Sequence, residues 1–222
     1  MSLLLVGVSH RTAPVSLLDQ IAAHTDSIES LRNDIAASPF VAEVMVVSTC
    51  NRLEVTAEVV RFHGAVTDIS TRLAKHTGVH LDELTTHLYV HFEERAVHHM
   101  FTVASGLDSM IVGEQQILGQ VRGSLREAQE AGNAARALND LGQTALRVGK
   151  RVHSETGIDR HGASVVSVAL DLAHDAIGDL TDRSALVVGA GAMASLTVQT
   201  LAARGVADIT VASRTSESTK RV

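Results

Sequence analysis

The chain has 222 residues, of which 45% are hydrophobic, 20% charged and 2% aromatic, and its formal net charge is −6. Because this length exceeds the commonest size of a single domain, we expect two domains. The negative charge and the few aromatic side chains argue against a broad basic or base-stacking surface, so a nucleic-acid partner would have to be bound by a local patch.

The single cysteine and the length of the apolar runs bear on the cellular compartment. One cysteine excludes an internal disulfide and a cysteine-rich zinc site, and we predict no metal site. The apolar run at the N-terminus is too short for a signal peptide, and no run of about 18 apolar residues occurs. These features predict a cytoplasmic protein without a membrane-spanning segment.

The first part of the chain has the apolar patterns of alternating strands and helices. In "LEVTAEV" (53–59) apolar residues alternate strictly with Glu54, Thr56 and Glu58, which predicts a strand with one apolar and one polar face. The overall order is βαββαβ, which predicts a ferredoxin-like α+β fold. The expected elements are a strand at 3–9, a helical segment after Pro14, strands at 42–48 and 53–59, a helix over about 63–77 and a strand at 87–92.

From residue 92 to about 178 the sequence predicts mainly helices, which are added to this fold. The segment "GDLTDRS" (178–184) then breaks the helical pattern, so we place a domain boundary near Thr181. The apolar stripes that indicate the helices are Val97, Met100, Phe101 and Ala104; Ile117, Val121, Leu125 and Ala128; and the segment 163–178.

The only cysteine lies in "STCNRLEV" (48–55), between two strands that follow one another in the chain. A lone cysteine is most often a small buried hydrophobe. Here, however, two polar residues separate Cys50 from the apolar run, Asn51 favours a turn, and the charge of Arg52 would stabilise a thiolate. These features make Cys50 a candidate nucleophile.

A second motif follows the predicted boundary. The segment 184–215 has the order strand, glycine turn, helix and strand, which is typical of a Rossmann-type dinucleotide-binding unit. Gly189 and Gly191 would form the tight turn at the pyrophosphate, and Ala194 replaces the last glycine of the motif. The expected cofactor-binding residues are Gly189, Ala190, Gly191, Ala192, Met193, Ala194, Ser213 and Arg214.

The residues after the second strand of this unit bear on the choice of cofactor. Ser213 and Arg214 stand where a protein specific for NAD carries an acidic residue, and they suit a ribose 2′-phosphate. They predict NADPH, although an arginine in this place can also simply face solvent. A reactive thiol and a dinucleotide site together suggest redox chemistry on an acyl group, in which a thioester forms and is then reduced to an aldehyde.

Four motifs make the chain resemble the glutamyl-tRNA reductase family over nearly its whole length. They are "GVSHRTAPV" (7–15), "STCNRLEV" (48–55), "ASGLDSMIVGEQQILGQVR" (104–122) and "VVGAGAMA" (187–194). The resemblance implies NADPH-dependent reduction of glutamyl-tRNA(Glu) to glutamate-1-semialdehyde through a thioester. This reaction is the first step of the C5 route to 5-aminolevulinate, and hence of tetrapyrrole (porphyrin and haem) biosynthesis.

The resemblance also implies roles for single residues. Cys50 would be the nucleophile, Arg52 would pair bidentately with a carboxylate of the glutamate, and His99, which lies off the apolar stripe of its helix, would assist acyl transfer. The role of His10 stays open. The implied substrate-binding residues are Thr49, Asn51, Arg52, Ser109, Glu114, Gln115 (where family members often have proline), Gln116 and Gln120.

The family's organisation gives the expected division of the chain. Residues 1–160 would be the catalytic domain that binds glutamyl-tRNA, 161–180 a connecting helix, and 181–222 the start of an incomplete Rossmann-type NADP-binding domain. The family's long helical dimerisation domain is expected to be absent, and the full-length protein to be a homodimer. The aminomutase that takes up the semialdehyde is a further expected partner.

Two alternatives stay open at this point. The first is an NADP-dependent acyl-phosphate or aldehyde reductase that uses the same thioester chemistry without tRNA. The second is a module that only binds tRNA or a protein partner. Its local basic patch would consist of Arg136, Arg147, Lys150, Arg151 and Arg160.

Overall fold

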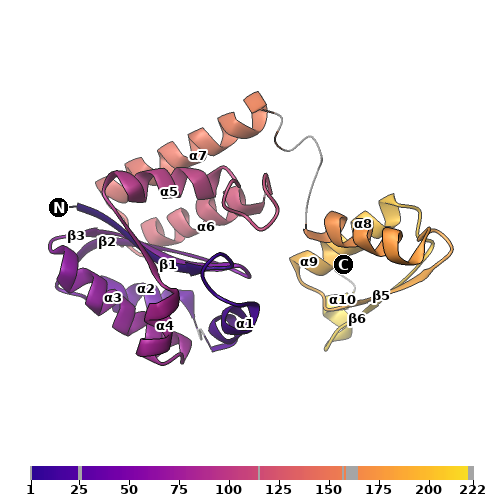
Figure 1. Cartoon of the computed structure of the whole chain (residues 1–222), viewed down its shortest axis with the longest axis horizontal. Helices are drawn as coiled ribbons and strands as arrows, with labels where there is room; N and C mark the ends of the chain where they lie inside the picture. The colour runs from indigo at the N-terminus through magenta and orange to yellow at the C-terminus, as the bar shows by residue number, and fades with distance from the viewer. Residues whose placement is uncertain (1, 25–26, 115, 157, 159–164, 220–222) are drawn as a thin grey trace. The chain divides into compact units, whose positions relative to one another are not determined.

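The computed structural model of the chain describes residues 2–24, 27–114, 116–156, 158 and 165–219. The chain divides into two compact units, Met1–Asp159 and Arg160–Val222, each of which has a core of its own (Figure 1). In the described part of the chain no helix is long and apolar enough to cross a membrane.

An antiparallel sheet forms the centre of the first unit, with the strand order β2-β3-β1-β4. In the register of this sheet, Gly7 of β1 pairs with Glu54 of β3 on one side and with Tyr89 of β4 on the other. The strands are β1 (Ser2–Ser9), β2 (Val41–Thr49), β3 (Arg52–Val59) and β4 (Tyr89–Phe92).

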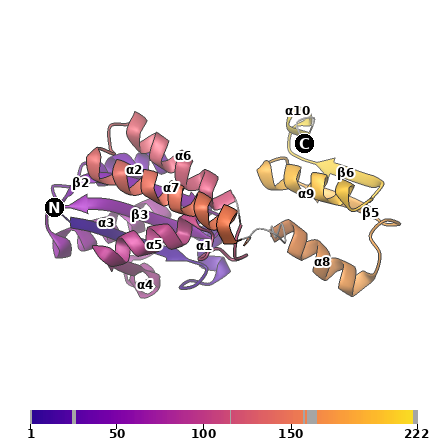
Figure 2. The ribbon, with the colours of Figure 1, turned by 90° about the horizontal axis from the view of Figure 1, so that it is seen from above.

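Two layers of helices cover the two faces of the sheet (Figures 1 and 2). Because successive side chains of a strand point to opposite faces, Leu4 and Val6 of β1 pack in the core of the first layer and Leu5 in that of the second. The first layer consists of α1 (Val15–His24), α2 (Ile28–Ala36), α3 (Phe62–Thr77) and α4 (Leu81–His87), and the second of α5 (Glu94–Ala104), α6 (Gln116–Glu130) and α7 (Arg136–Thr156).

The second helical layer changes the environment of β3. The alternation in this strand predicted a polar face, yet Glu54 and Thr56 are 1% and 0% exposed. They are buried because α5, α6 and α7 cover that face of the sheet. The prediction of two faces was therefore right about which residues share a face, and the structure adds that the polar face is covered as well.

Three further details differ from the pattern in the sequence. The short helix α4 was not predicted, and it delays the start of β4 from residue 87 to Tyr89. The residues 105–114, predicted as mostly helical, form turns between α5 and α6. On α5 the buried residues are Ala96, Met100, Val103 and Ala104, whereas Val97 and Phe101 of the predicted stripe are only partly buried.

The stripe predicted for α6 agrees with the structure. Ile117, Val121, Leu125 and Ala128 are all buried in the core between the sheet and the second layer. α7 approaches this core through glycines, and a Cβ at Gly149 would lie 2.5 Å from the carbonyl oxygen of α5's last residue. The close contact of α5 and α7 fixes the helix that carries His99.

The second unit contains the predicted strand, glycine turn, helix and strand. β5 (Ser184–Val188) and β6 (Asp208–Ala212) pair in parallel, and α9 (Ala192–Ala203) connects them. α8 (Val165–Ile177) belongs to this unit, since its Leu170 and Ala173 pack against the core of β5, α9 and β6. The division into two compact units therefore precedes α8, and the expected domain bounds at 160 and 181 stay predictions. A short helix, α10 (Ser216–Thr219), follows β6.

Candidate functional site

The turn between β2 and β3 presents Cys50 to solvent. β2 ends at Thr49 and β3 begins at Arg52, so Cys50 and Asn51 form the connection. The hydroxyl of Thr49 accepts a hydrogen bond from the Asn51 N–H at 3.1 Å, and the Asn51 carbonyl accepts one from the His10 N–H at 2.9 Å. Cys50 is a free, exposed cysteine, as the polar turn predicted, and not a buried hydrophobe.

The thiol of Cys50 is not activated by Arg52 in this structure. Partial burial of the thiol, and after it the negative charge of Glu114, raise the pKa of Cys50 above its ordinary value. The expectation that Arg52 stabilises the thiolate is therefore wrong, because the guanidinium of Arg52 points into the fold and is engaged there. A cation that pairs with Glu114 would offset its negative charge and so lower the pKa of the Cys50 thiol.

Because Cys50 is the only cysteine, its pKa can be measured from alkylation alone. Glu114→Gln removes the negative neighbour, so we expect a lower thiol pKa and faster reaction with iodoacetamide at neutral pH. Glu127→Gln, at an exposed acid of α6, serves as the matched control and should leave the rate unchanged. A Glu114→Gln rate profile identical to wild type would remove Glu114 from the surroundings of the thiol.

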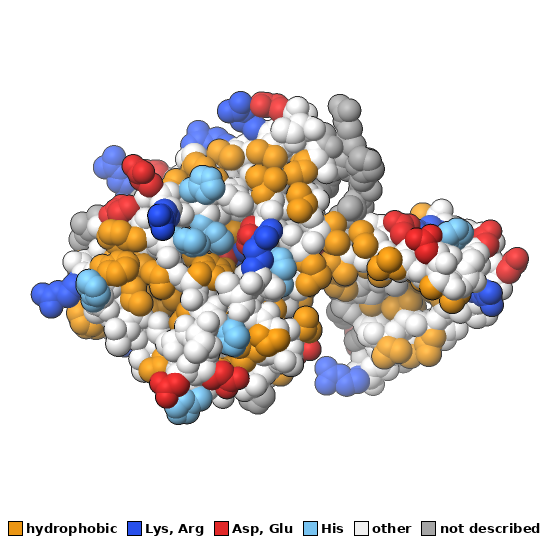
Figure 3. All heavy atoms as spheres, in the orientation of Figure 1, with side chains coloured by type: hydrophobic (Ala, Val, Ile, Leu, Met, Phe, Trp, Pro, Cys, Tyr) orange, Lys and Arg blue, Asp and Glu red, His pale blue; other side chains and the backbone are white. Residues whose placement is uncertain are grey.

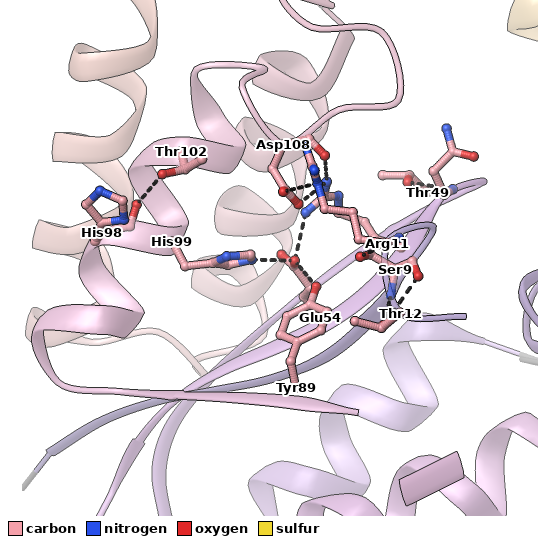
Figure 4. Close-up of polar contacts among 12 residues, drawn as sticks. Ser9, Arg11, Thr12, Thr49, Glu54, Tyr89, His98, His99, Thr102 and Asp108 are labelled. Carbon is pink, nitrogen blue, oxygen red and sulfur yellow. Dashed lines mark hydrogen bonds and ion pairs between the residues drawn. The ribbon is translucent and has the colours of Figure 1, made fainter. Parts of the chain in front are cut away.

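Arg52 joins β3 to the turns that precede α6. Its side chain is 2% exposed, and Nη1 donates to Glu54 Oε1 at 2.8 Å. Nη2 donates to the Asp108 carbonyl at 2.6 Å and to Asp108 Oδ2 at 3.0 Å. Arg11, which is half exposed, donates through Nε to the other Asp108 oxygen at 2.6 Å (Figure 4). The result is a chain of alternating charges that runs from the surface into the sheet.

The buried end of this chain is Glu54. Its Oε1 accepts hydrogen bonds from Arg52, from the hydroxyl of Tyr89 and, at 2.8 Å, from His99 Nε2 (Figure 4). Burial by itself raises the pKa of Glu54, but the bond from His99 and the charge of Arg52 outweigh it and lower the pKa to about 2. Because an ionised carboxylate only accepts, His99 Nε2 carries a proton, and Nδ1 is left without a bond to Glu54.

Gly7 makes room for this cluster. A Cβ at this position would lie 2.7 Å from Glu54 Cγ and 3.0 Å from the ring of Tyr89. Both contacts are shorter than ordinary van der Waals separations, so a side chain on β1 would displace the carboxylate. The first of the four motifs, which begins at Gly7, thus has a direct structural role.

The other implied substrate-binding residues lie in the turns before α6 and in the first turns of that helix. Ser109 is buried, Glu114 is partly buried, and the turns that hold them are closed by the bond from the Gly113 N–H to the Gly106 carbonyl at 2.9 Å. Gln116 is partly buried and Gln120 exposed, and Gln115 lies outside the described residues. The substrate contacts of all these residues stay predictions.

The sequence analysis did not select Glu54, Tyr89, Asp108 or Arg11. Glu54 stands two residues after Arg52, on the same face of β3, and that spacing of opposite charges was the available indication. From the sequence alone these two charges could equally have faced solvent, because the second helical layer that buries them is not evident there. In the described part of the chain no group of three or more His, Cys, Asp or Glu side chains is arranged to hold a metal ion.

In the second unit, the predicted cofactor residues meet at the ends of β5 and β6. Gly189 has φ = 120°, which favours glycine, and Gly191 is the N-cap of α9. Around them lies a cavity of about 690 Å³ lined by Val188, Gly189, Ala190, Gly191, Ala212, Ser213, Arg214 and Thr215. Ala192 and Met193 begin α9, and Ala194 is buried in the core of the unit.

The cavity suits a dinucleotide. Nothing lies within 4 Å of a Cβ built at Gly189 or Gly191, so a pyrophosphate has room beside the N-terminus of α9. Arg214 is exposed at the cavity and can reach a phosphate. The hydroxyl of Ser213 is already engaged, since it donates to the Thr215 carbonyl at 2.7 Å.

Comparison with known proteins covers both units. Residues 6–156 match the family model described as glutamyl-tRNA(Glu) reductase, N-terminal domain, and residues 171–222 match that described as shikimate / quinate 5-dehydrogenase. A glutamyl-tRNA reductase of Streptomyces coelicolor is 54% identical over 225 residues, which are all of this chain and 39% of that protein. Glutamyl-tRNA reductase 1 of Nocardioides sp. is 51% identical over 222 residues, all of this chain and 52% of that protein.

A solved structure agrees with these relatives. The glutamyl-tRNA reductase of Methanopyrus kandleri superposes with a TM-score of 0.62 and 35% identity, over 98% of this chain and 51% of that chain. The chain thus spans about half the length, or less, of the relatives it matches. With two thirds of its residues covered by the N-terminal family model, the chain belongs to the glutamyl-tRNA reductase family.

Proposed function

We propose that the chain contains the acyl-transfer site of an enzyme that reduces glutamyl-tRNA(Glu) to glutamate-1-semialdehyde with NADPH, at the start of tetrapyrrole biosynthesis. The observation that carries this proposal is the exposed thiol of Cys50, on a turn that continues into the buried cluster of Arg52, Glu54 and His99. Family membership and the cavity at Gly189 support the choice of substrate and cofactor class.

The proposed acyl transfer uses groups of this chain alone. The Cys50 thiolate attacks the carbonyl carbon of the glutamyl ester, the C–S bond forms, and the C–O bond to the tRNA ribose breaks. His99, whose Nδ1 is not used by Glu54, is the candidate to accept the proton of the Cys50 thiol and to give it to the ribose oxygen as that oxygen leaves. Bound NADPH would supply the hydride that converts the thioester to the aldehyde.

Arg52 and its surroundings would hold the glutamate. The Arg52–Glu54 pair is buried in the sheet, whereas the contacts of Arg52 with Asp108 come from a turn. A substrate carboxylate can therefore replace Asp108 on Arg52 and Arg11 while Glu54 keeps its place. Thr49, Asn51, Ser109, Glu114 and Gln116 would form the walls of the same pocket.

The finer fold assignments belong to this proposal as well. The strand order β2-β3-β1-β4, with antiparallel neighbours throughout, supports a ferredoxin-like first unit. The parallel pair of β5 and β6 around the glycine turn supports the start of a Rossmann-type second unit. A homodimer and delivery of the semialdehyde to an aminomutase complete the proposal for the whole protein.

A purely tRNA-binding role has weaker support. Of the proposed basic residues, Arg136 and Arg151 form i,i+4 ion pairs with Asp140 and Glu155. Arg147 bonds to the hydroxyl of Thr144, and Arg160 lies outside the described residues. Two of the cations of this patch are thus paired with acids of the same helix.

Product analysis with the 222-residue chain separates these functions. We expect glutamyl-tRNA to be converted to free glutamate and uncharged tRNA, with or without NADPH, because the described second unit has only two strands with which to build a cofactor domain. Glutamyl phosphate and free glutamate should not react. Turnover of glutamyl phosphate would favour an acyl-phosphate reductase, and formation of semialdehyde would show a functional cofactor site in this chain.

The cofactor proposal is tested at Arg214 in a chain extended to the length of its relatives. Loss of a charge-assisted phosphate contact costs about 1.5–3 kcal/mol, so Arg214→Ala should weaken NADPH binding more than tenfold and leave NADH binding nearly unchanged. Fluorescence titration with both nucleotides measures this. Equal losses for both would indicate damage to the fold, and no loss for either would exclude Arg214 from the site.

A further inference from the structure

The first unit also has a hollow, and of the residues that line it the proposed acyl transfer uses His99 alone. It measures about 690 Å³ and is lined by His91 of β4 and by Glu94, Arg95, His98, His99 and Thr102 of α5. Figure 3 shows histidine side chains gathered on this unit beside basic ones. In Figure 4, His98, His99 and Thr102 lie on the far side of Glu54 from Thr49, so the hollow is at the other end of the polar cluster from the Cys50 turn.

Local geometry explains why these residues share one surface. Arg95, His98, His99 and Thr102 are spaced i, i+3, i+4 and i+7, so they form one stripe of α5 beside its buried stripe. The residue before α5, Glu93, has φ = 49° and is the only non-glycine with positive φ in the described part of the chain. The Glu93 N–H donates to the Leu3 carbonyl at 2.8 Å and holds this sharp turn. The turn lets the stripe of α5 line one hollow together with His91 of β4.

The hollow offers one guanidinium and three imidazole rings to a ligand. Arg95 is exposed, and its guanidinium forms no hydrogen bond or ion pair with any residue that the structure describes. Burial, and after it His99 and Arg95, lower the pKa of His91. His91 stacks on His99 with ring centroids 4.6 Å apart. The single acid that lines the hollow is Glu94.

We propose that this hollow binds a phosphate group of the single-stranded 3′ end of glutamyl-tRNA, with Arg95 as its main ligand. The inference rests on the proposed function, because it takes the glutamyl ester to lie at Cys50. The nucleotides before the ester must then leave the turn along the surface, and single strands are held by cations along such a path. The guanidinium of Arg95 supplies that contact, and His99, which lines the same hollow, is bonded to Glu54.

Two substitutions in the hollow should have opposite effects if the ligand is an anion. Arg95→Ala should weaken binding of a 5′-phosphorylated CCA trinucleotide about tenfold. It should also make the slope of log affinity against log salt concentration less steep by about 0.7, the value for one phosphate contact on a single strand. Glu94→Gln removes a repulsive charge and should tighten binding. Arg126→Ala, at an exposed and ion-paired arginine of α6, should change neither.

The same variants separate this inference from the proposed function. With glutamyl-tRNA, Arg95→Ala should lower kcat/KM for deacylation about tenfold, while acylation of Cys50 by p-nitrophenyl acetate, which has no phosphate, stays at the wild-type rate. Wild-type deacylation that Arg95→Ala leaves unchanged would overturn the inference and keep the function. The chain could instead bind the trinucleotide through Arg95 and yet leave glutamyl-tRNA intact. That result would support the phosphate site and overturn the proposed acyl transfer.

The source of the phosphate is tested with NADPH, which also carries phosphates. We expect NADPH not to compete with the trinucleotide. Three results would each overturn the proposal. The first is competition by NADPH that disappears in Arg95→Ala. The others are a wild-type chain that does not bind the trinucleotide, and weaker trinucleotide binding by Glu94→Gln.

Discussion

Cys50→Ser is expected to abolish the release of glutamate from glutamyl-tRNA, with a loss on the order of a thousandfold or more, as for other removed nucleophiles. A serine hydroxyl is far harder to deprotonate than a thiol, and the exposed turn offers no strong base to compensate. The assay follows free glutamate and uncharged tRNA with time. The variant should fold normally because the residue is exposed and its side chain supports no core.

The matched control for this substitution is Ser48→Ala, at an exposed serine of the same strand end. It should leave the rate close to wild type. Glutamate release by Cys50→Ser at the wild-type rate would mean that the ester is hydrolysed without a covalent intermediate, and the proposed mechanism would then be wrong.

Glu54→Gln is expected to remove both stability and activity. The substitution leaves the guanidinium of Arg52 buried without its main partner, and breaking a buried ion pair in this way costs about 3–5 kcal/mol. It also removes the acceptor that fixes the ring of His99. Urea unfolding measures the first effect and deacylation of glutamyl-tRNA the second. Glu58→Gln, on the same strand and the same face, is the control and should cost little.

The pH dependence of this stability gives an independent check. The pKa of Glu54 is lowered to about 2 in the folded chain, so its contribution is complete above the unfolded value of about 4.3 and is lost as the pH falls toward 2. The difference in unfolding free energy between wild type and Glu54→Gln should therefore be constant near neutral pH and shrink in acid. A difference that stays the same down to pH 3 would mean that packing and not charge makes Glu54 important.

Local patterns predicted the parts of the site that depend on local structure. The turn at Cys50 follows from two strands that end in polar residues, and the turn at Gly189 from a strand and a helix that meet at glycine. Both occur where the sequence placed them. The stripe of α6 was also predicted, because apolar residues at helical spacing need only one partner surface.

The parts of the site that the sequence did not predict depend on contacts between segments that are distant in the chain. Glu54 is ionised although buried because α5 brings His99, and the sheet brings Tyr89, to the oxygen that Arg52 also contacts. Asp108 reaches Arg52 from 56 residues further along the chain, which no spacing in the sequence indicates. For the same reason Arg52, judged by its neighbours in sequence, was assigned to Cys50, although in the fold it belongs to Glu54.

The most direct test of the account is mass spectrometry of the chain after brief exposure to glutamyl-tRNA without NADPH, followed by acid quenching and proteolysis. Because the chain has one cysteine, a thioester can lie at one position only. We predict a glutamyl adduct on the peptide that contains Cys50, removable by hydroxylamine and absent in Cys50→Ser. Deacylation of the tRNA without any adduct, or an adduct on another residue, would contradict the central claim that Cys50 is the acyl acceptor.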